Sequence, residues 1–145
     1  MESDSRAPIL LVEGDSVDEA RTIKAYSETG IKNRLLVART AENALTLLRA
    51  CARGLRFRLV LLDMHIPGMG ARNLLKRIRE DHTIKDVPVV VMSNHHETDE
   101  EVEVVAAQAD SWVRRPTEHK PLVTLLDRVI RFFLMKDRKE AAEKA

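Results

Sequence analysis

Five short apolar runs recur along the chain, each bounded by polar or turn-forming residues. They cover residues 9–12, 35–37, 59–62, 89–92 and 111–113. Continuous apolar runs of this length, without polar alternation, are typical of parallel strands that are buried on both faces. The pattern therefore predicts five short strands.

Between these runs the spacing of apolar residues changes to that of helices. One helical face is formed by positions i, i+3, i+4, i+7 and i+11, which are Ala41, Ala44, Leu45, Leu48 and Ala52. Ser16 with Glu19, and Thr98 with Glu101, have the spacing of a capping box and mark helix starts. Strands that alternate with helices predict an α/β domain with a five-stranded parallel sheet, covered by helices on both faces.

The length of 145 residues fits one such domain. We expect a flexible N-terminal tail over 1–7, the folded domain over 8–136 and a polar C-terminal extension over 137–145. The net charge of +1 provides no global field that would attract nucleic acid or a membrane surface. With no signal peptide and no apolar run long enough to cross a bilayer, we expect the cytoplasm as compartment.

Polar groups follow several of the predicted strands at the end where parallel strands place their chemistry. The first strand is followed by Glu13 and Asp15, the third by Asp63 and the fourth by Ser93. Carboxylates from two strands suit Mg²⁺, which prefers oxygen ligands. A hydroxyl and the cation of Arg115, after the fifth strand, suit a phosphoryl group.

Four motifs in this order carry a resemblance to a known family: Leu-Leu-Val-Glu (10–13), Leu-Leu-Asp-Met-His-Ile-Pro (61–67), Val-Val-Val-Met-Ser (89–93) and Arg-Pro (115–116). The chain resembles, over about residues 9–134, the receiver domains of two-component response regulators, which have a flavodoxin-like, CheY-like fold. Residues 79–88 are also similar to the single-domain regulators that partner bacterial phytochrome kinases. The resemblance implies a stand-alone receiver in a phosphorelay, with a sensor histidine kinase as its partner.

The resemblance also implies a role for each site residue. Asp63 would be the phosphoacceptor. Mg²⁺ would be held by Asp63, by the backbone carbonyl of His65, by Glu13 and, after a local rearrangement, by Asp15. The phosphoryl group would be read by a switch set made of Ser93, Asn94, Trp112 and Arg115. Pro116 would follow a cis peptide bond.

Two positions depart from the family pattern. The first strand of the family ends in two adjacent acids, whereas Gly14 follows Glu13 here. Arg115 stands where the family has lysine. With one acid missing, the planar guanidinium of Arg115 could pair bidentately with Asp63 and occupy the place of the metal, which predicts weak Mg²⁺ binding. Two mechanisms therefore stay open: phosphorylation of Asp63, and a degenerate pocket in a phosphorylation-independent interaction module.

An enzyme on the same architecture fits the sequence poorly. A phosphatase with an aspartate nucleophile needs a second acid two residues later, where this chain has His65. A flavin site needs a loop rich in donors after the first strand, and the acidic 13–16 loop would repel phosphate. We also interpret His95, His96 and Glu97 as solvated loop residues rather than a zinc site.

The last helix carries more apolar surface than its own core contact needs. Its apolar residues span an arc of about 200°, roughly twice the usual stripe. They are Leu122, Val123, Leu125, Leu126, Val129, Ile130, Phe132, Phe133 and Leu134. This excess favours a homodimer through the C-terminal helix.

Overall fold

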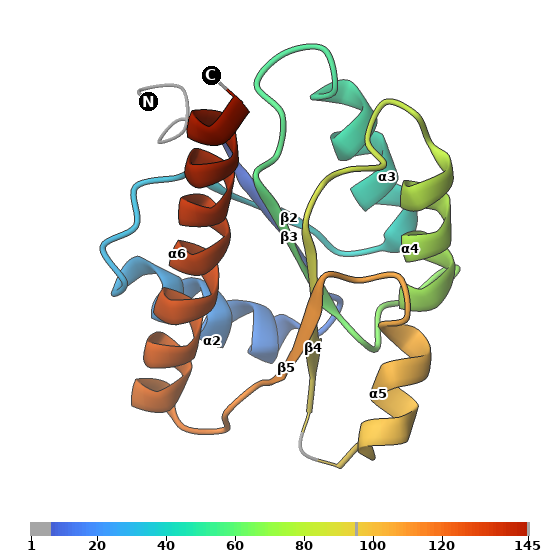
Figure 1. The fold of residues 1–145 in the computed structure, drawn as a ribbon. Coiled ribbons are helices and arrows are strands. Elements are labelled where there is room, and N and C mark those ends of the chain that lie inside the picture. The colour runs from blue at the N-terminus through green and yellow to red at the C-terminus, as the bar shows by residue number, and fades with distance from the viewer. Residues whose placement is uncertain (1–6, 95, 145) are drawn as a thin grey trace.

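The computed structural model describes residues 7–94 and 96–144, with side chains as far as Lys136. Strands and helices alternate over the described residues (Figure 1). The strands are β1 (Ile9–Val12), β2 (Leu35–Ala38), β3 (Leu59–Asp63), β4 (Val89–Ser93) and β5 (Ser111–Arg114). The helices are α2 (Ser16–Ser27), α3 (Ala41–Ala50), α4 (Ala71–Glu80), α5 (Asp99–Val105) and α6 (His119–Lys144). All five predicted strands are confirmed, and β2 to β5 each extend one residue beyond the predicted end.

All strand pairs are parallel, and the strand order across the sheet is β2-β1-β3-β4-β5. The chain moves from β1 to β2 on one side and returns to place β3 on the other side of β1. The helices after β1 and β3 therefore leave the sheet toward opposite faces, and a crevice opens between the carboxyl ends of these two strands. The residues that end β1 and β3 therefore lie at this crevice.

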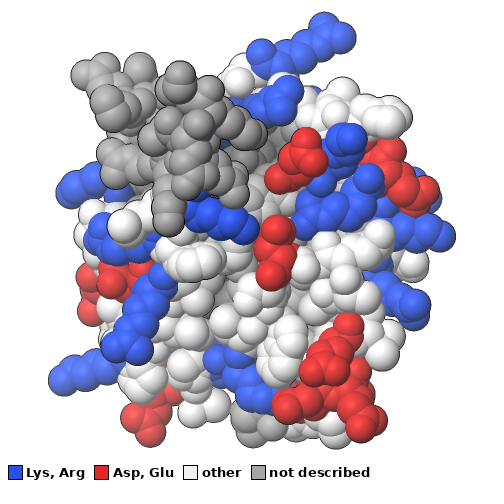
Figure 2. Space-filling view, in the orientation of Figure 1, with Lys and Arg blue, Asp and Glu red and all other residues white. Residues whose placement is uncertain are grey.

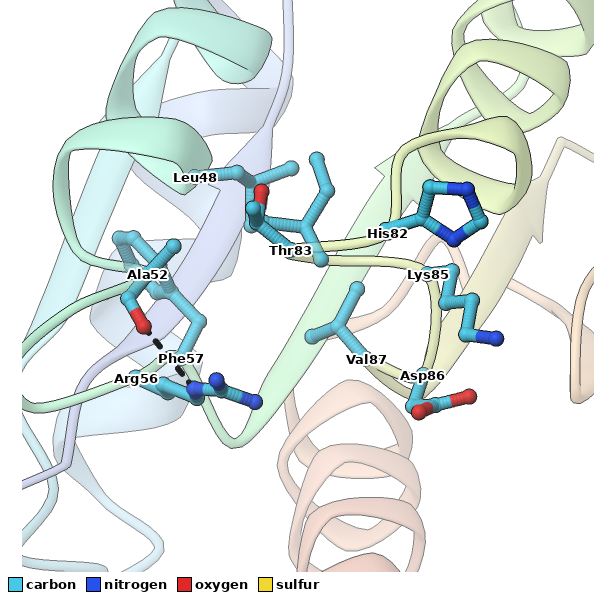
Figure 3. A pocket seen from close by; sticks show the side chains of 10 residues that line it. Leu48, Ala52, Arg56, Phe57, His82, Thr83, Lys85, Asp86 and Val87 are labelled. Carbon is cyan, nitrogen blue, oxygen red and sulfur yellow. Dashed lines mark hydrogen bonds between the residues drawn. The ribbon is translucent and has the colours of Figure 1, made fainter.

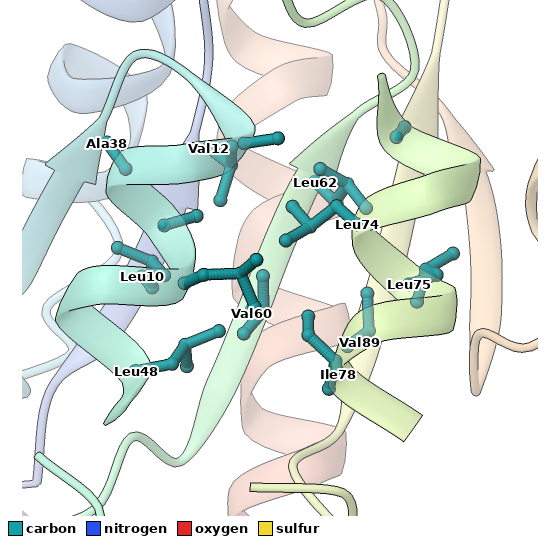
Figure 4. Close-up of a cluster of buried hydrophobic side chains, with 14 of the residues drawn as sticks. Leu10, Val12, Ala38, Leu48, Val60, Leu62, Leu74, Leu75, Ile78 and Val89 are labelled. Carbon is teal, nitrogen blue, oxygen red and sulfur yellow. The ribbon is translucent and has the colours of Figure 1, made fainter. Parts of the chain in front are cut away.

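Alternate residues of the central strands pack on opposite faces of the sheet. Figure 1 shows α2 and α6 on one face and α3, α4 and α5 on the other. Leu10, Val60 and Leu62 belong to the core under α3 and α4 (Figure 4). Leu11 and Leu61 belong to the core under α2 and α6. Since both faces are covered, β1, β3 and β4 are buried along their whole length, which explains their lack of polar alternation.

The helix starts agree only in part with the predicted capping boxes. Thr98 caps α5 by accepting a hydrogen bond from the backbone N–H of Glu101, as predicted. The cap of α2 is Asp15, which accepts from the backbone N–H of Asp18 at 2.9 Å, so the expected Ser16 cap is wrong. Both residues are good caps, and the carboxylate one residue earlier takes the role.

The described structure continues past both ends of the expected folded domain, 8–136. The expected N-terminal tail lies outside the described residues except for Ala7, which is buried and whose carbonyl accepts from the side-chain amide of Asn33 at 2.8 Å. The backbone of α6 is helical as far as Lys144, so the polar C-terminal extension expected from residue 137 begins within this helix. Among the described helices, α6 included, none is long and apolar enough to cross a membrane.

Candidate functional site

An ion triad closes the crevice between the carboxyl ends of β1 and β3. The guanidinium of Arg115 donates from Nη1 to Oε1 of Glu13 at 2.6 Å and from Nη2 to Oδ1 of Asp63 at 2.7 Å. All three side chains are almost completely buried, with 0%, 0% and 5% exposed for Arg115, Glu13 and Asp63. Arg115 therefore bridges the two acids, with one nitrogen on each, instead of pairing bidentately with Asp63.

The remaining carboxylate oxygens of the triad are also hydrogen-bonded. The backbone N–H of Asp15 donates to Oε2 of Glu13, and that of His65 donates to Oδ2 of Asp63, each at 3.2 Å. Every carboxylate oxygen of the two acids thus has an N–H donor. Hydrogen bonds of this kind let charged groups remain in a buried site, although the buried Nε of Arg115 has no hydrogen-bond partner among the described residues.

Burial dominates the electrostatics of the two acids. It raises the pKa of Glu13 to about 7, although the charge of Arg115 opposes this rise. Burial likewise raises the pKa of Asp63, again against the charge of Arg115. One guanidinium compensates the charge of only one carboxylate. Glu13 therefore retains its proton toward neutral pH.

The loop after β1 leaves no side chain to complete an acidic cluster. A Cβ at Gly14 would lie 2.5 Å from Cδ of Pro67, so a larger residue needs a shift of the 64–70 loop. The carboxylate of Asp15 is engaged as the cap of α2 and is exposed. The expected swing of Asp15 into the site is therefore not observed.

The expected switch residues lie along the neighbouring strands β4 and β5. Ser93 is fully buried, and its hydroxyl donates to the carbonyl of Val113 at 3.4 Å. The backbone N–H of Asn94 donates to Glu97 at 3.2 Å. Trp112 is half-buried, with the guanidinium of Arg114 stacked 5.4 Å from its ring centre. Arg114 also donates to the carbonyls of Asn94 and Glu97, and these two hydrogen bonds hold the loop after β4 against the end of β5.

Two residues of α2 that no sequence motif indicates, Asp18 and Arg21, lie beside the triad. Oδ2 of Asp18 lies 3.9 Å from Nη1 of Arg115, which adds a third acid beside the triad. Arg21 donates to Oδ1 of Asp18 at 2.9 Å and to the carbonyl of Pro116 at 2.5 Å. Helix α2 thus supports the loop that carries Arg115. The helical spacing of these two residues gives no hint of the long-range contact.

Glu97 is buried, so the expected solvated position of its side chain is wrong. Its Oε1 lies 2.8 Å from Nε2 of His65, and this contact ties the loop after β4 to the loop after β3. Although burial alone would raise the pKa of Glu97, hydrogen bonds from the Asn94 backbone and from His65 hold this pKa below its ordinary value. His96 is exposed, and His95 lies outside the described residues. No cluster of three or more metal-ligating side chains exists among the residues that are described.

The expected cis bond before Pro116 is wrong. No peptide bond among the described residues is cis, the Arg115–Pro116 bond included. The backbone N–H of Arg115 donates to the carbonyl of Ser93 at 2.8 Å, so β5 stays paired with β4 up to this residue. The guanidinium therefore reaches the triad from a trans backbone.

A second concavity lies at the opposite edge of the sheet, between the end of α3 and the loop before β4 (Figure 3). It is a cavity of about 130 Å³. Its floor is apolar and continuous with the core, and its rim is polar. The lining residues are Leu48, Ala52, Arg56, Phe57, His82, Thr83, Ile84, Lys85, Asp86 and Val87. No buried ion pair faces this cavity among the described residues, so the triad is the stronger candidate for chemistry.

The surface carries both signs of charge. Figure 2 shows basic and acidic side chains interspersed over the visible face, with acidic ones gathered over α5 at the lower right. The first turn of α5 supplies Asp99, Glu100 and Glu101. This mixture agrees with the near-zero net charge.

Fold and site together define an α/β domain with an acid at the end of its third strand, the architecture of a signalling receiver. Residues 9–127 match the family described as response regulator receiver domain. The chain belongs to this family, whose members act in two-component signalling.

Three matches, one to a sequence and two to solved structures, illustrate the similarity. Response regulator Rcp1 of Synechocystis sp. is 24% identical, over 92% of this chain and 95% of its own length. The phosphorylated cyanobacterial phytochrome response regulator RcpA has a TM-score of 0.75 at 24% identity, covering 89% of this chain and 94% of its own. The Mn²⁺-bound form of Rcp1 has a TM-score of 0.72 at 24% identity, and the match covers 88% of this chain and 94% of the Rcp1 chain. The two solved structures confirm the five-stranded, CheY-like fold.

Proposed function

We propose that this receiver domain accepts a phosphoryl group on Asp63 from a sensor histidine kinase and signals through protein contacts. The observation that carries the proposal is the position of Asp63, at the carboxyl end of β3 and over the crevice between β1 and β3. Ser93 ends the adjacent strand β4, and Arg115 already contacts the carboxylate. A hydroxyl and a guanidinium are suitable partners for a phosphoryl group on that carboxylate.

The proposed step is a phosphoryl transfer without redox change. A carboxylate oxygen of Asp63 attacks the phosphorus of a phosphohistidine, and the P–N bond breaks. The electron pair of that bond stays on the imidazole nitrogen, which takes up a proton from solvent. Arg115 contacts Oδ1 of Asp63, and a cation positioned beside the attacking carboxylate would stabilise the negative charge that develops on the transferred phosphoryl group.

Acetyl phosphate as a small phosphoryl donor tests this proposal. We expect the intact mass to increase by one phosphoryl group, and Asp63→Asn to abolish the increase. The modified residue is then identified by peptide mapping. Modification of any other residue, or no modification by acetyl phosphate or by a kinase, contradicts the proposal.

A second candidate function is a phosphorylation-independent interaction module. The observation in its favour is that Arg115 neutralises Asp63 in the unmodified pocket, and a hydrogen bond from His65 occupies the other carboxylate oxygen. In this case Asp63→Asn leaves partner binding unchanged. If Asp63 is instead the phosphoacceptor, beryllofluoride, a mimic of the acyl phosphate, should change partner binding by the parent protein. The Asp63→Asn variant should then show no such change.

The upstream partner is proposed to be a histidine kinase of the bacterial phytochrome type. The similarity of residues 79–88 to regulators of this group supports it, as does the description of RcpA as a phytochrome response regulator. Phosphotransfer from a phytochrome kinase and from an unrelated histidine kinase, compared at equal concentration, tests the choice. Equal rates of phosphotransfer from the two kinases would contradict a phytochrome-type kinase as the partner.

We further propose that a second copy of the chain docks on the outer face of α6. Phe132 and Met135 are 60% and 66% exposed there, one helical turn apart. Burial of such side chains in a dimer is favourable because it removes apolar surface from water. Sedimentation should show a dimer that Phe132→Gln converts to a monomer, whereas Leu55→Gln, on an exposed loop, should not. A monomeric parent protein excludes this contact.

A further inference from the structure

The divalent cation expected of a receiver domain does not fit the donors in this pocket. All four oxygens of Glu13 and Asp63 already accept hydrogen bonds, two from Arg115 and two from backbone N–H groups. A cation bound between the two acids would have to displace the guanidinium, which carries the same sign of charge. Binding would therefore require breaking two buried, charge-assisted hydrogen bonds of 2.6 and 2.7 Å.

The further carboxylates near the pocket, those of Asp15 and Asp18, are already engaged and are not available to a hard cation. Mg²⁺ is bound through carboxylates and water in near-octahedral geometry, and each missing acid weakens its site. Residue 14 is glycine, and its neighbourhood leaves no room for a side chain, because a Cβ there would meet Cδ of Pro67 at 2.5 Å. Asp15 caps α2 instead. Asp18 is near, but its Oδ2 faces Nη1 of Arg115 at 3.9 Å.

We infer that the guanidinium of Arg115 is the resident cation of this site, in the position between Glu13 and Asp63 that would otherwise hold a divalent metal. The inference rests on the proposed function only in taking Asp63 as the input residue. Its consequence is that the resting pocket binds no divalent cation, and that modification of Asp63 does not depend on one.

The geometry explains why arginine fills this position. The planar fork of a guanidinium presents two nitrogens to two separate acceptors at once. A lysine ammonium is a compact single centre on a flexible stem, so it would engage the two acids less completely and leave lone pairs available. Arg115→Lys therefore keeps the charge of the pocket but removes the bridge, which makes it the informative variant.

Titration with Mg²⁺, and with Mn²⁺ followed by its free-ion paramagnetic resonance signal, tests the inference directly. We expect no saturable binding by the parent protein at millimolar metal. Arg115→Lys should bind at least about tenfold more tightly than the parent protein. Arg114→Lys is the matched control, because the side chain of Arg114 contacts the carbonyls of Asn94 and Glu97 rather than the two acids. Circular dichroism establishes that each variant is folded.

Each result of the titration decides the inference. Saturable binding by the parent protein at the level of Arg115→Lys overturns it. No binding by either protein also overturns it, since Arg115 would then not be the group that excludes the metal. A gain in Arg115→Lys alone supports it, and Arg115→Gln offers a second folded variant if the lysine variant is unstable.

A second measurement separates this inference from the proposed function. The parent protein is incubated with acetyl phosphate, once with Mg²⁺ and once with excess chelator, and its mass is recorded. Equal modification in both supports the inference, and modification only with Mg²⁺ overturns it. If neither sample is modified, the phosphoacceptor proposal fails, and the metal titration alone still decides whether Arg115 is the resident cation.

Discussion

Two ion pairs of equal length lie in different regions of this protein. In the pocket at the carboxyl edge of the sheet, Arg115 contacts Asp63 at 2.7 Å. On the outer surface of α6, Arg131 contacts Asp127 at 2.7 Å. The side chains of the first pair are 0% and 5% exposed, and those of the second are 50% and 39% exposed. Burial, rather than length, should therefore determine what the loss of each ion pair costs.

The physical reason is the solvation of the charges. Water screens the α6 pair and solvates either partner when the other is removed. In the pocket the loss of one partner leaves a charge that water cannot reach, while the gain from the intact pair only offsets its own desolvation. The buried triad thus fixes the positions of Glu13, Asp63 and Arg115 in the pocket but adds little to the free energy of unfolding.

The largest effect is expected from breaking the triad with Arg115→Ala. Removal of the guanidinium leaves Glu13 and Asp63 buried without a counter-charge, which should cost about 3–5 kcal/mol of unfolding free energy near neutral pH. Urea denaturation measures it. If Arg115 is the resident cation, Mg²⁺ should restore part of the lost stability in this variant and none in the parent protein. A loss no greater than that of a surface pair would mean that water enters the pocket.

The next effect concerns pH and tests the burial of Glu13. The pKa of Glu13 is raised by burial to about 7 in the folded protein. Between about pH 4.5 and 7 the folded state therefore binds more protons than the unfolded state, and stability falls as pH rises. Glu13→Gln should remove this part of the pH profile, whereas Glu103→Gln, on the exposed side of α5, should not. Equal profiles for the two variants would contradict the burial of this charge.

The fold was largely predictable because its signals are local. The all-apolar strands follow from a sheet covered on both faces, and their predicted starts are confirmed at all five positions. The α2 cap was wrong by one residue because Asp15 and Ser16 are both good caps, and the choice depends on how the loop approaches the helix. The polar segment expected after residue 136 continues α6, since a polar sequence does not by itself end a helix.

The site was predictable as a set of strand ends but not as a network of contacts. Strand topology brings Glu13, Asp63 and Arg115 together, and the sequence motifs located all three. The bridging geometry was not predictable, because it depends on which atoms of a planar group meet two acids across the sheet. Asp18 and Glu97 carried no local signal, since their partners lie 97 and 32 residues away along the chain, at Arg115 and His65.

A smaller effect, on the shape of the pocket rather than its charge, is expected from Gly14→Ala. The added Cβ would lie 2.5 Å from the rigid ring of Pro67, so the 64–70 loop must move, at a cost of about 1–3 kcal/mol. Gly54→Ala is the matched control, because nothing lies within 4 Å of a Cβ there. The control should be neutral or stabilising by about 0.4–1 kcal/mol. Urea denaturation of the two variants, measured side by side, tests this expectation. Equal stability of the two variants would contradict the tight contact at Gly14.

The smallest effect is expected at the exposed pair that matches the pocket in length. Asp127→Asn keeps the size of the side chain and removes its charge, and Arg131 retains its hydrogen bond to the carbonyl of Thr29 at 2.8 Å. Because the two residues are one helical turn apart and solvated, the loss should be about 0.3–0.5 kcal/mol and should shrink as salt is added. Urea denaturation at low and high ionic strength measures both quantities. A loss as large as that of Arg115→Ala, or one insensitive to salt, would show that length governs these pairs after all, and the contrast between pocket and surface would fail.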